Sequence, residues 1–202
     1  MRLLALLADA AGPAVAALGG PRGAVERSAA GPPAECLPGL VREVLDEAGL
    51  GPDELDALAV LTGPGSFTAI RAAVAAARAL ALATGRPVYA SSALELGAEL
   101  ACGDDPLLVA APAGRGELAV QHFAAPDRAL DEPVLLAPNE VADAVRTVPR
   151  WVLVEGEPLP PLPAARAPEL VRVGASALAR AAAARAGRGV APVPGPAVRP
   201  LY

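Results

Sequence analysis

The sequence predicts an α/β protein made of two related subdomains, each with a mixed sheet and flanking helices. Two observations support this fold class. Apolar strand-like runs and helix-like segments occur in both halves of the chain, and residues 57–90 read as a strand, a loop, a helix and a second strand. Such a unit builds parallel sheet with a crossover helix. We place the boundary near 103–105, which gives subdomains 1–103 and 104–202.

The amino-acid composition excludes or disfavours several classes of function. Of the 202 residues, 53% are hydrophobic, which is enough for a substantial core and excludes wholesale disorder. The 17 basic residues, all Arg, stand against 22 acidic ones, and the net charge of −5 disfavours autonomous binding of nucleic acid. Aromatic residues make up 2%, too few to stack single-stranded RNA. The lack of Lys excludes Schiff-base and P-loop-lysine chemistry.

The cysteines and the N-terminus predict a soluble, cytoplasmic protein with no membrane attachment. Cys36 and Cys102 share no metal-ligand spacing, and with His122 as the single His a Cys/His zinc site has too few ligands. Asp9 closes a short apolar run, so residues 2–8 indicate a buried first strand and not a signal peptide. No uncharged stretch reaches the roughly 18 residues of a membrane span without Gly or Pro.

The first fifty residues predict a three-stranded antiparallel start followed by a helix. Apolar runs at 2–8, 13–18 and 23–28 are separated by turn residues. The next apolar residues recur on one helical face, with Pro38 in the first turn and Gly49 after the last. These residues are Leu37, Leu40, Val41, Val44, Leu45 and Ala48.

The rest of the chain alternates strands and helices. We predict a strand, a long helix ended by Gly85, and another strand, at 57–61, 67–84 and 88–90. In the second half we predict two paired strands, a helix, a strand and a final helix that packs back on the first subdomain. Their ranges are 106–111, 117–123, 139–148, 151–154 and 176–186, while 156–168 and 190–200 are expected to lack regular structure.

A glycine-rich loop precedes the helix at 67–84. Its glycines free the backbone for a tight turn, and Ser66 is placed to cap the helix. Exposed N–H groups at a helix start can also hold an anion, but no Lys follows the loop as a P-loop requires. On local chemistry we favour a capped turn over phosphate binding. The motif residues are Gly63, Pro64, Gly65, Ser66, Phe67 and Thr68.

The helix at 67–84 has almost no polar face. Only Arg71 and Arg78, seven positions apart, interrupt its apolar residues. A helix that is apolar all round is normally buried all round, whereas a sheet covers one side only. The other side needs a second layer or a partner protein, and we favour a partner over an alanine-biased surface helix. The apolar residues concerned include Ile70, Ala73, Val74, Ala76, Ala77 and Leu80.

No catalytic motif is evident. Asp9 ends the first strand, where a carboxylate can hold a metal-bound water or a phosphate, although a turn residue is the favoured interpretation. His122 lies in a strand pattern with no nearby acid or nucleophile in sequence, so we expect a structural role. Paired-carboxylate, HExxH and GxSxG patterns are missing, and we predict no catalytic residue and no metal site.

Three segments of the first half share a pattern with one known family. They are the loop and helix start at 63–71, the segment 79–88 and the Ser-Ser-Ala-Leu-Glu run at 91–95. This pattern resembles that of the TsaB (YeaZ) family of tRNA threonylcarbamoyladenosine biosynthesis, in which a GPGSFTG motif, a small-residue helix and an SSLE motif follow one another. Weaker similarity covers most of the chain.

The resemblance implies an actin/Hsp70/sugar-kinase-like (ribonuclease H-like) fold and a protein that is not itself the catalyst. In that family the paralogue TsaD carries the metal-bound catalytic site and forms N6-threonylcarbamoyladenosine in tRNA, next to the anticodon. TsaB binds and supports TsaD, and the ATPase TsaE joins the complex. We therefore expect no intrinsic cofactor in this chain, with ATP, Mg and tRNA engaged through the complex.

The implied partner surface lies in the first subdomain, on the helices at about 35–48 and 68–84. In the absence of TsaD the same surface is expected to form a homodimer. The implied contact residues are Leu37, Leu40, Val41 and Val44 on the first helix, and Ile70, Arg71, Ala73, Val74, Ala76, Ala77, Arg78 and Leu80 on the second.

The chain departs from the family pattern at polar positions. The Asp-Thr-Ser that follows the first strand in the family reads Asp9-Ala10-Ala11 here. The alternative function is a nucleotide-binding enzyme, a phosphotransferase or peptidase-like protein on the same fold, which would use Asp9 and the loop at 63–66. The lost hydroxyls and the lack of Lys disfavour it. Direct tRNA binding is a third reading, and it requires the scattered Arg residues to converge in space.

Overall fold

The computed structural model describes residues 1–9, 12–101, 103, 105–156 and 166–201. The chain forms two compact units. The first unit combines Met1–Ser91 with Gly174–Tyr202, and the second is Ser92–Val173. We predicted a single boundary near 103–105; the structure instead divides the chain at two points, because the C-terminal segment returns to the first unit after the second is complete.

The sheet of the first unit has the strand order β3-β2-β1-β4-β5. The first three strands are antiparallel, as predicted, and β1, β4 and β5 run parallel. This mixed sheet is the one expected of the actin/Hsp70/sugar-kinase-like fold. The bounds are Leu3–Asp9 for β1, Gly12–Gly20 for β2, Gly23–Ser28 for β3, Ala57–Leu61 for β4 and Val88–Ser91 for β5.

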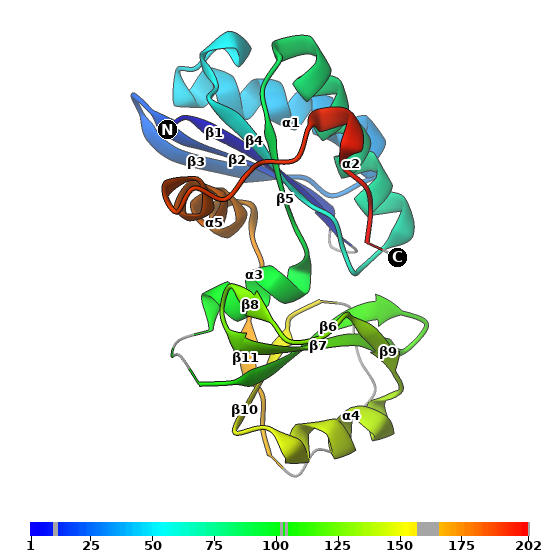
Figure 1. The fold of residues 1–202 in the computed structure, drawn as a ribbon. Coiled ribbons are helices and arrows are strands. Elements are labelled where there is room, and N and C mark those ends of the chain that lie inside the picture. The colour runs from blue at the N-terminus through cyan, green and yellow to red at the C-terminus, as the bar shows by residue number, and fades with distance from the viewer. Residues whose placement is uncertain (10–11, 102, 104, 157–165, 202) are drawn as a thin grey trace. The chain divides into compact units, whose positions relative to one another are not determined.

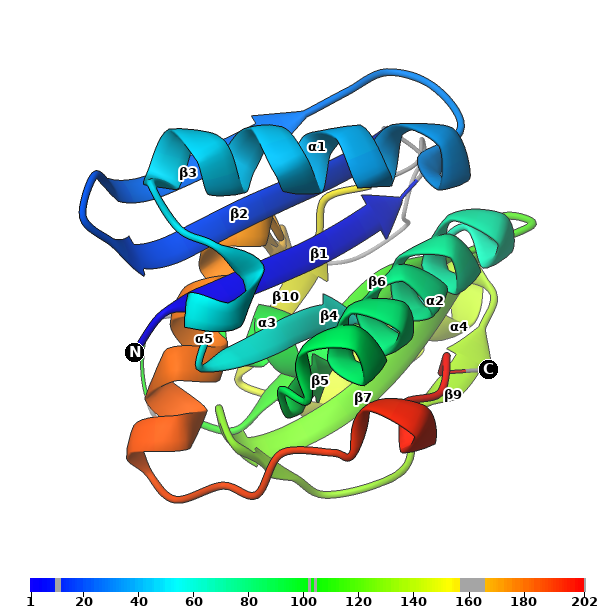
Figure 2. The same cartoon turned by 90° about the horizontal axis from the view of Figure 1, so that it is seen from above.

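Helices cover both faces of this sheet (Figures 1 and 2). Helices α1 (Pro33–Ala48) and α2 (Phe67–Thr84) lie side by side on one face, and α5 (Ala175–Gly187) packs on the other. Side chains alternate along each strand, so even-numbered residues of β1 and β4 face α1 and α2. They form one buried cluster with the two helices, to which Leu4, Leu6, Leu58 and Val60 contribute.

The observed ends of α1 and α2 can be compared with the capping residues predicted from the sequence. Gly49 follows α1 and Gly85 follows α2, both with positive φ (68° and 69°), as predicted. The predicted start of α1 near Pro38 is wrong, because the helix begins at Pro33 and Pro38 lies inside it. The predicted cap by Ser66 is also wrong, since the Ser66 side chain makes no capping hydrogen bond.

The second unit is built on a sheet of order β11-β10-β6-β7-β8, with β9 also paired to β7. The predicted hairpin and the strand after it are confirmed as β6, β7 and β10, whereas α3, β8, β9 and β11 were not predicted. The bounds are Leu107–Gly114 for β6, Glu117–Ala125 for β7, Arg128–Ala129 for β8, Val134–Leu136 for β9, Arg150–Val154 for β10 and Glu169–Val171 for β11.

Two short helices cover this second sheet. Helix α4 (Pro138–Ala144) packs on one face and continues as the 3-10 turn Val145–Thr147, which shortens the helix predicted at 139–148. Helix α3 (Ala93–Leu100) packs on the other face. A reciprocal capping box begins α3: the Ser92 hydroxyl accepts from the Glu95 N–H at 3.0 Å, and the Ser92 N–H donates to the Glu95 carboxylate at 2.8 Å.

The C-terminal segment is tied to the first unit at several points. The Glu26 carboxylate on β3 accepts hydrogen bonds from the first N–H groups of α5, Ala175 at 3.2 Å and Ser176 at 3.1 Å. A carboxylate at a helix N-terminus satisfies donors that have no intrahelical partner. Beyond α5 the chain pairs with the edge of β5 at Val88 and Val193. The 3-10 turn Gly195–Ala197 (η3) then packs on α2.

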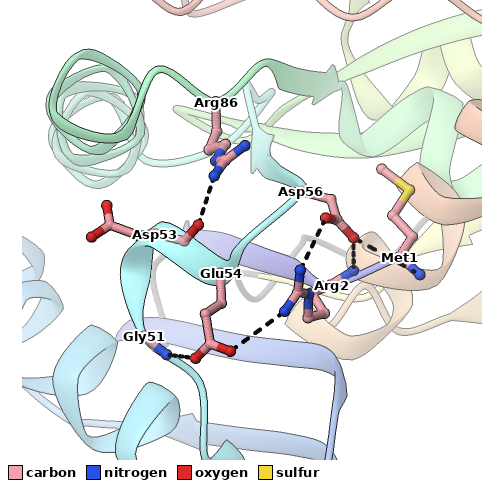
Figure 3. Close-up of polar contacts among 7 residues, drawn as sticks. All are labelled: Met1, Arg2, Gly51, Asp53, Glu54, Asp56 and Arg86. Atoms are coloured by element: carbon pink, nitrogen blue, oxygen red, sulfur yellow. Dashed lines mark hydrogen bonds and ion pairs between the residues drawn. The ribbon is translucent and has the colours of Figure 1, made fainter.

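A polar network fixes the start of β1 (Figure 3). The Arg2 N–H donates to the Asp56 carboxylate at 2.6 Å, and the Arg2 guanidinium lies near both Glu54 and Asp56. Arg86 joins from the end of α2 by donating to the Asp53 carbonyl at 2.6 Å. The network therefore connects β1, the 3-10 turn Pro52–Glu54 (η1) and the α2–β5 loop.

Two helical glycines give opposite expectations for substitution by Ala. A Cβ at Gly97 of α3 would lie 2.9 Å from methyl groups of both Val109 and Val154, whereas a Cβ at Gly39 of α1 meets nothing within 4 Å. Gly97→Ala should lower the free energy of unfolding by about 1–3 kcal/mol through overpacking. Gly39→Ala should raise it by about 0.5–1 kcal/mol. Urea denaturation measures both; equal effects would contradict the packing of α3.

The Asp56 interactions predict a pH dependence of stability. The pKa of the Asp56 carboxyl lies below its ordinary value of 3.8. The hydrogen bond from the Arg2 N–H lowers this pKa most, burial raises it, and the positive charge of Arg2 lowers it further. A carboxyl group whose pKa is lower in the folded state stabilises the protein at pH values above its unfolded-state pKa. This contribution is lost as the pH falls through the folded-state pKa. The destabilisation by Asp56→Asn should therefore be largest at neutral pH and shrink below 3.8.

Denaturation curves of the wild type and Asp56→Asn across this pH range provide the measurement. Asp53→Asn is the control, because the Asp53 side chain makes no hydrogen bond or ion pair among the described residues. A difference between wild type and Asp56→Asn that stays constant with pH would contradict the assignment.

Candidate functional site

The glycine-rich loop between β4 and α2 is held at its start by Thr62. The Thr62 N–H and hydroxyl both donate to the Ser91 carbonyl, at 2.9 and 3.1 Å, and the Leu201 N–H donates to the Thr62 carbonyl at 2.7 Å. Gly63 has φ 111°, and a Cβ there would lie 2.9 Å from the Ile70 Cδ1. The loop therefore needs glycine at this position and fixes where α2 begins.

The inward face of α2 packs on the sheet with four Ala residues together with Ile70 and Val74. The buried positions recur every three or four residues, so this face belongs to the core of the first unit. Seven of the twelve predicted partner contacts are buried in this way and are not available to a partner on the surface. They are Leu37, Leu40 and Val44 on α1, and Ile70, Ala73, Val74 and Ala77 on α2.

The other five predicted contacts are at least partly exposed. Arg71 and Arg78 are exposed on the outward face of α2, while Val41 of α1 and Ala76 and Leu80 of α2 are half-buried and pack at the edges of the core. Sequence analysis did not single out Ala75, Ala79 and Leu82, which share the exposed side with the two Arg residues. Their spacing was the available signal: Ala75 lies four residues after Arg71, Ala79 four after Ala75 and Leu82 four after Arg78.

Large apolar side chains mark the two ends of this face. Phe67 is 54% exposed and Leu82 is 80% exposed. The other described aromatic residues, Tyr89, Phe123 and Trp151, are all buried. Because aromatic residues are so scarce in this chain, an exposed Phe beside an exposed Arg is unlike the rest of its surface. We call the exposed residues Phe67, Arg71, Ala75, Arg78, Ala79 and Leu82 the α2 face.

Arg71 is ordered by Phe67. Its guanidinium lies over the Phe67 ring, 5.0 Å from the ring centre. Attraction between a cation and an aromatic face holds the guanidinium in place without using its N–H donors. Arg and aromatic residues dominate the energetics of protein–protein interfaces. The α2 face thus has the residue types of a binding surface, with small Ala residues at its centre.

The other predicted site residues do not assemble a catalytic centre within the described residues. Asp9 ends β1, as predicted, and Ala10 and Ala11 lie outside the described residues. The His122 Nδ1 lies 2.6 Å from the Asp131 carboxylate, which also accepts from the His122 N–H at 2.9 Å. Asp131 thereby joins the β8–β9 connection to β7. No group of three or more His, Cys, Asp and Glu in the described part of the chain could hold a metal ion.

Helix α2 also has the length and apolar composition of a membrane span, with a mean hydropathy of 1.4 over 18 residues. It is the one such helix in the described ranges. Its inward side packs in the core of the first unit against β1 and β4, which is the environment of a core helix.

Comparison with known proteins places this site in a family. A family model described as TsaD, tRNA N6-adenosine threonylcarbamoyltransferase, matches residues 20–154, a range that includes α1 and α2. The solved structure of YeaZ from Pseudomonas aeruginosa superposes with a TM-score of 0.77 at 29% identity, over 100% of this chain and 99% of that one. A second structure, titled as similar to peptidase YeaZ from Pseudomonas aeruginosa, has a TM-score of 0.75 at 30% identity, over 100% and 98%.

Curated relatives match over a shorter segment. The tRNA N6-adenosine threonylcarbamoyltransferase of Maricaulis maris is 42% identical over 73 residues, which are 36% of this chain and 19% of that protein. The protein of the same name from Anaeromyxobacter dehalogenans is 50% identical over 56 residues, 28% of this chain and 17% of that protein. The chain thus aligns with about a fifth of the length of these relatives.

The fold and the matched range define a protein of tRNA threonylcarbamoyladenosine biosynthesis with an actin/Hsp70/sugar-kinase-like fold. Since the family model covers more than half of the chain and the YeaZ structures cover all of it, the chain belongs to the TsaD family, in its TsaB (YeaZ) branch.

Proposed function

We propose that this protein is a non-catalytic partner subunit that binds TsaD and supports its formation of N6-threonylcarbamoyladenosine in tRNA next to the anticodon. The observation that carries the proposal is the α2 face. It presents Phe67 and Leu82 to solvent at its two ends and Ala75 and Ala79 at its centre. Exposed apolar surface of this kind is typical of interaction sites.

The geometry of α2 suits a helical partner. Its inward Ala residues hold it close to the sheet, while the loop at 62–66 and η3 fix its ends. A rigid helix with small central residues allows another backbone to approach closely. The larger Phe67 and Leu82 can then fill pockets on the partner, as interface anchors do.

The proposal extends to the composition of the complex. TsaE joins through the assembled subunits, and tRNA, ATP and Mg are engaged by the complex and not by an intrinsic cofactor site of this chain. In the absence of TsaD the α2 face pairs two copies of the chain. The net charge of −5 agrees with contact to tRNA through the complex, and the site of action is the cytoplasm.

Ala75→Glu tests the α2 face as the site of TsaD binding. Ala75 is exposed on α2, so the variant should fold normally. In the complex the longer side chain would prevent close approach of the partner, and its carboxylate would compete for Arg71 and Arg78, its neighbours at four and three residues. We expect the dissociation constant for TsaD from the same source to rise on the order of 100-fold. Calorimetry and light scattering coupled to gel filtration measure the loss of the complex.

Ala184→Glu is the matched control, because Ala184 is exposed on α5 at the opposite face of the same sheet. The previously implied position Ala76 is a poorer choice, since it is half-buried against the core. Binding of TsaD by Ala75→Glu at the wild-type affinity would show that the interface lies elsewhere.

A titration of the isolated chain with Mg-ATP separates the partner subunit from a nucleotide-binding enzyme. We expect no measurable binding heat. Micromolar binding that is lost in Asp9→Ala would contradict the proposal and place a nucleotide site at the end of β1.

A further inference from the structure

We infer that Arg71 and Arg78 are specificity-determining residues of the α2 face that pair with two carboxylates on the partner, set about two helical turns apart. The inference rests on the proposed function and adds to it the chemistry that the partner surface must present. It is carried by the placement of the two guanidinium groups and by the residues around them.

Neither guanidinium group has an acidic partner in the part of the chain that the structure describes. Among the described residues no carboxylate lies within 4.0 Å of Arg71 or Arg78, and the Phe67 ring is the one recorded partner of Arg71. By contrast, Arg2, Arg27, Arg150 and Arg172 each pair with Asp or Glu. Two charges without an ion-pair partner among the described residues thus lie on a helix that otherwise consists almost entirely of apolar residues.

The contact with Phe67 leaves Arg71 able to bind a carboxylate. The Arg71 Cζ lies over the Phe67 ring, 5.0 Å from its centre, and a contact with the ring face does not use the N–H donors of the guanidinium. A guanidinium edge matches a carboxylate with two parallel hydrogen bonds. Because Phe67 already orders the side chain, less conformational entropy is lost when the pair forms.

The spacing of Arg71 and Arg78 determines how far apart the two carboxylates of the partner must lie. Seven residues of α-helix rise about 10 Å, so Arg71 and Arg78 lie on the same side two turns apart. Ala75, between them, lets the partner backbone approach closely enough to bring its carboxylates into range. Acidic residues seven positions apart on a partner helix meet this requirement.

The surroundings favour protein carboxylates over the phosphates of RNA. Phe67 and Leu82 flank the two Arg residues with apolar surface, which a phosphate backbone does not cover. The neighbouring helix α1 carries exposed Glu35, Glu43 and Asp46 against a single Arg42, and this negative charge repels a polyanion. A partner with a few localised carboxylates in an apolar surface is complementary to the α2 face.

Charge reversal tests the inference. Arg71→Glu, Arg78→Glu and the double variant are compared with the wild type for binding to TsaD from the same source, by surface plasmon resonance at low and high salt. Each single reversal should weaken binding about 10-fold or more, and the double variant further. Salt should weaken the wild-type complex more than that of the double variant. Arg71→Lys should retain part of the affinity.

Arg180→Glu on α5 is the matched control. Arg180 is exposed on the helix that packs on the opposite face of the sheet, and it makes no ion pair with any described residue. Thermal denaturation checks that each variant is folded. If the reversals weaken binding no more than Arg180→Glu does while Ala75→Glu abolishes it, the proposed partnership stands and this inference falls. If the reversals disrupt only pairing between copies of the chain, the carboxylates belong to the second copy, which also overturns it. No binding by the wild type overturns both proposals.

Discussion

The close packing of α2 on the first sheet is the interaction on which the rest of the unit depends. Ala69, Ala73 and Ala77 are buried at this contact, and their small side chains bring the helix axis near the strands. The same contact decides which residues remain outside. With Ala on the inward side, the larger Phe67 and Leu82 and both Arg residues project outward, and the α2 face results from how the core is filled.

Much of this arrangement could be predicted from local patterns. The bounds of α2 were predicted correctly because Gly85 ends it and a glycine-rich loop precedes it. The exposed side of α2 was less predictable, since an all-apolar helix has no polar side that would show which residues face the sheet. Seven residues that the structure buries were therefore included among the expected partner contacts, and the exposed Ala75, Ala79 and Leu82 were not.

Other helices were missed or misplaced in the prediction for different physical reasons. Helix α3 was missed although Ser92 and Glu95 form its capping box, because its eight residues are too short for a clear helical period. The start of α1 was misplaced because two consecutive prolines, Pro32 and Pro33, fit a helix start as well as Pro38 does. The last helix was expected to pack back on the first subdomain, as α5 does, but its hydrogen bond to the Glu26 carboxylate, across 149 residues, is a contact that no local pattern encodes.

The pairing of Val193 with Val88 covers one edge of the first sheet. An unpaired edge strand is a template for adding another chain, and β5 would be such an edge. The C-terminal segment occupies it through two backbone hydrogen bonds, of 2.8 and 3.2 Å. At the opposite edge β3 exposes Glu26 and Arg27, charges that resist strand addition. Both edges of the sheet are thereby protected against edge-to-edge aggregation.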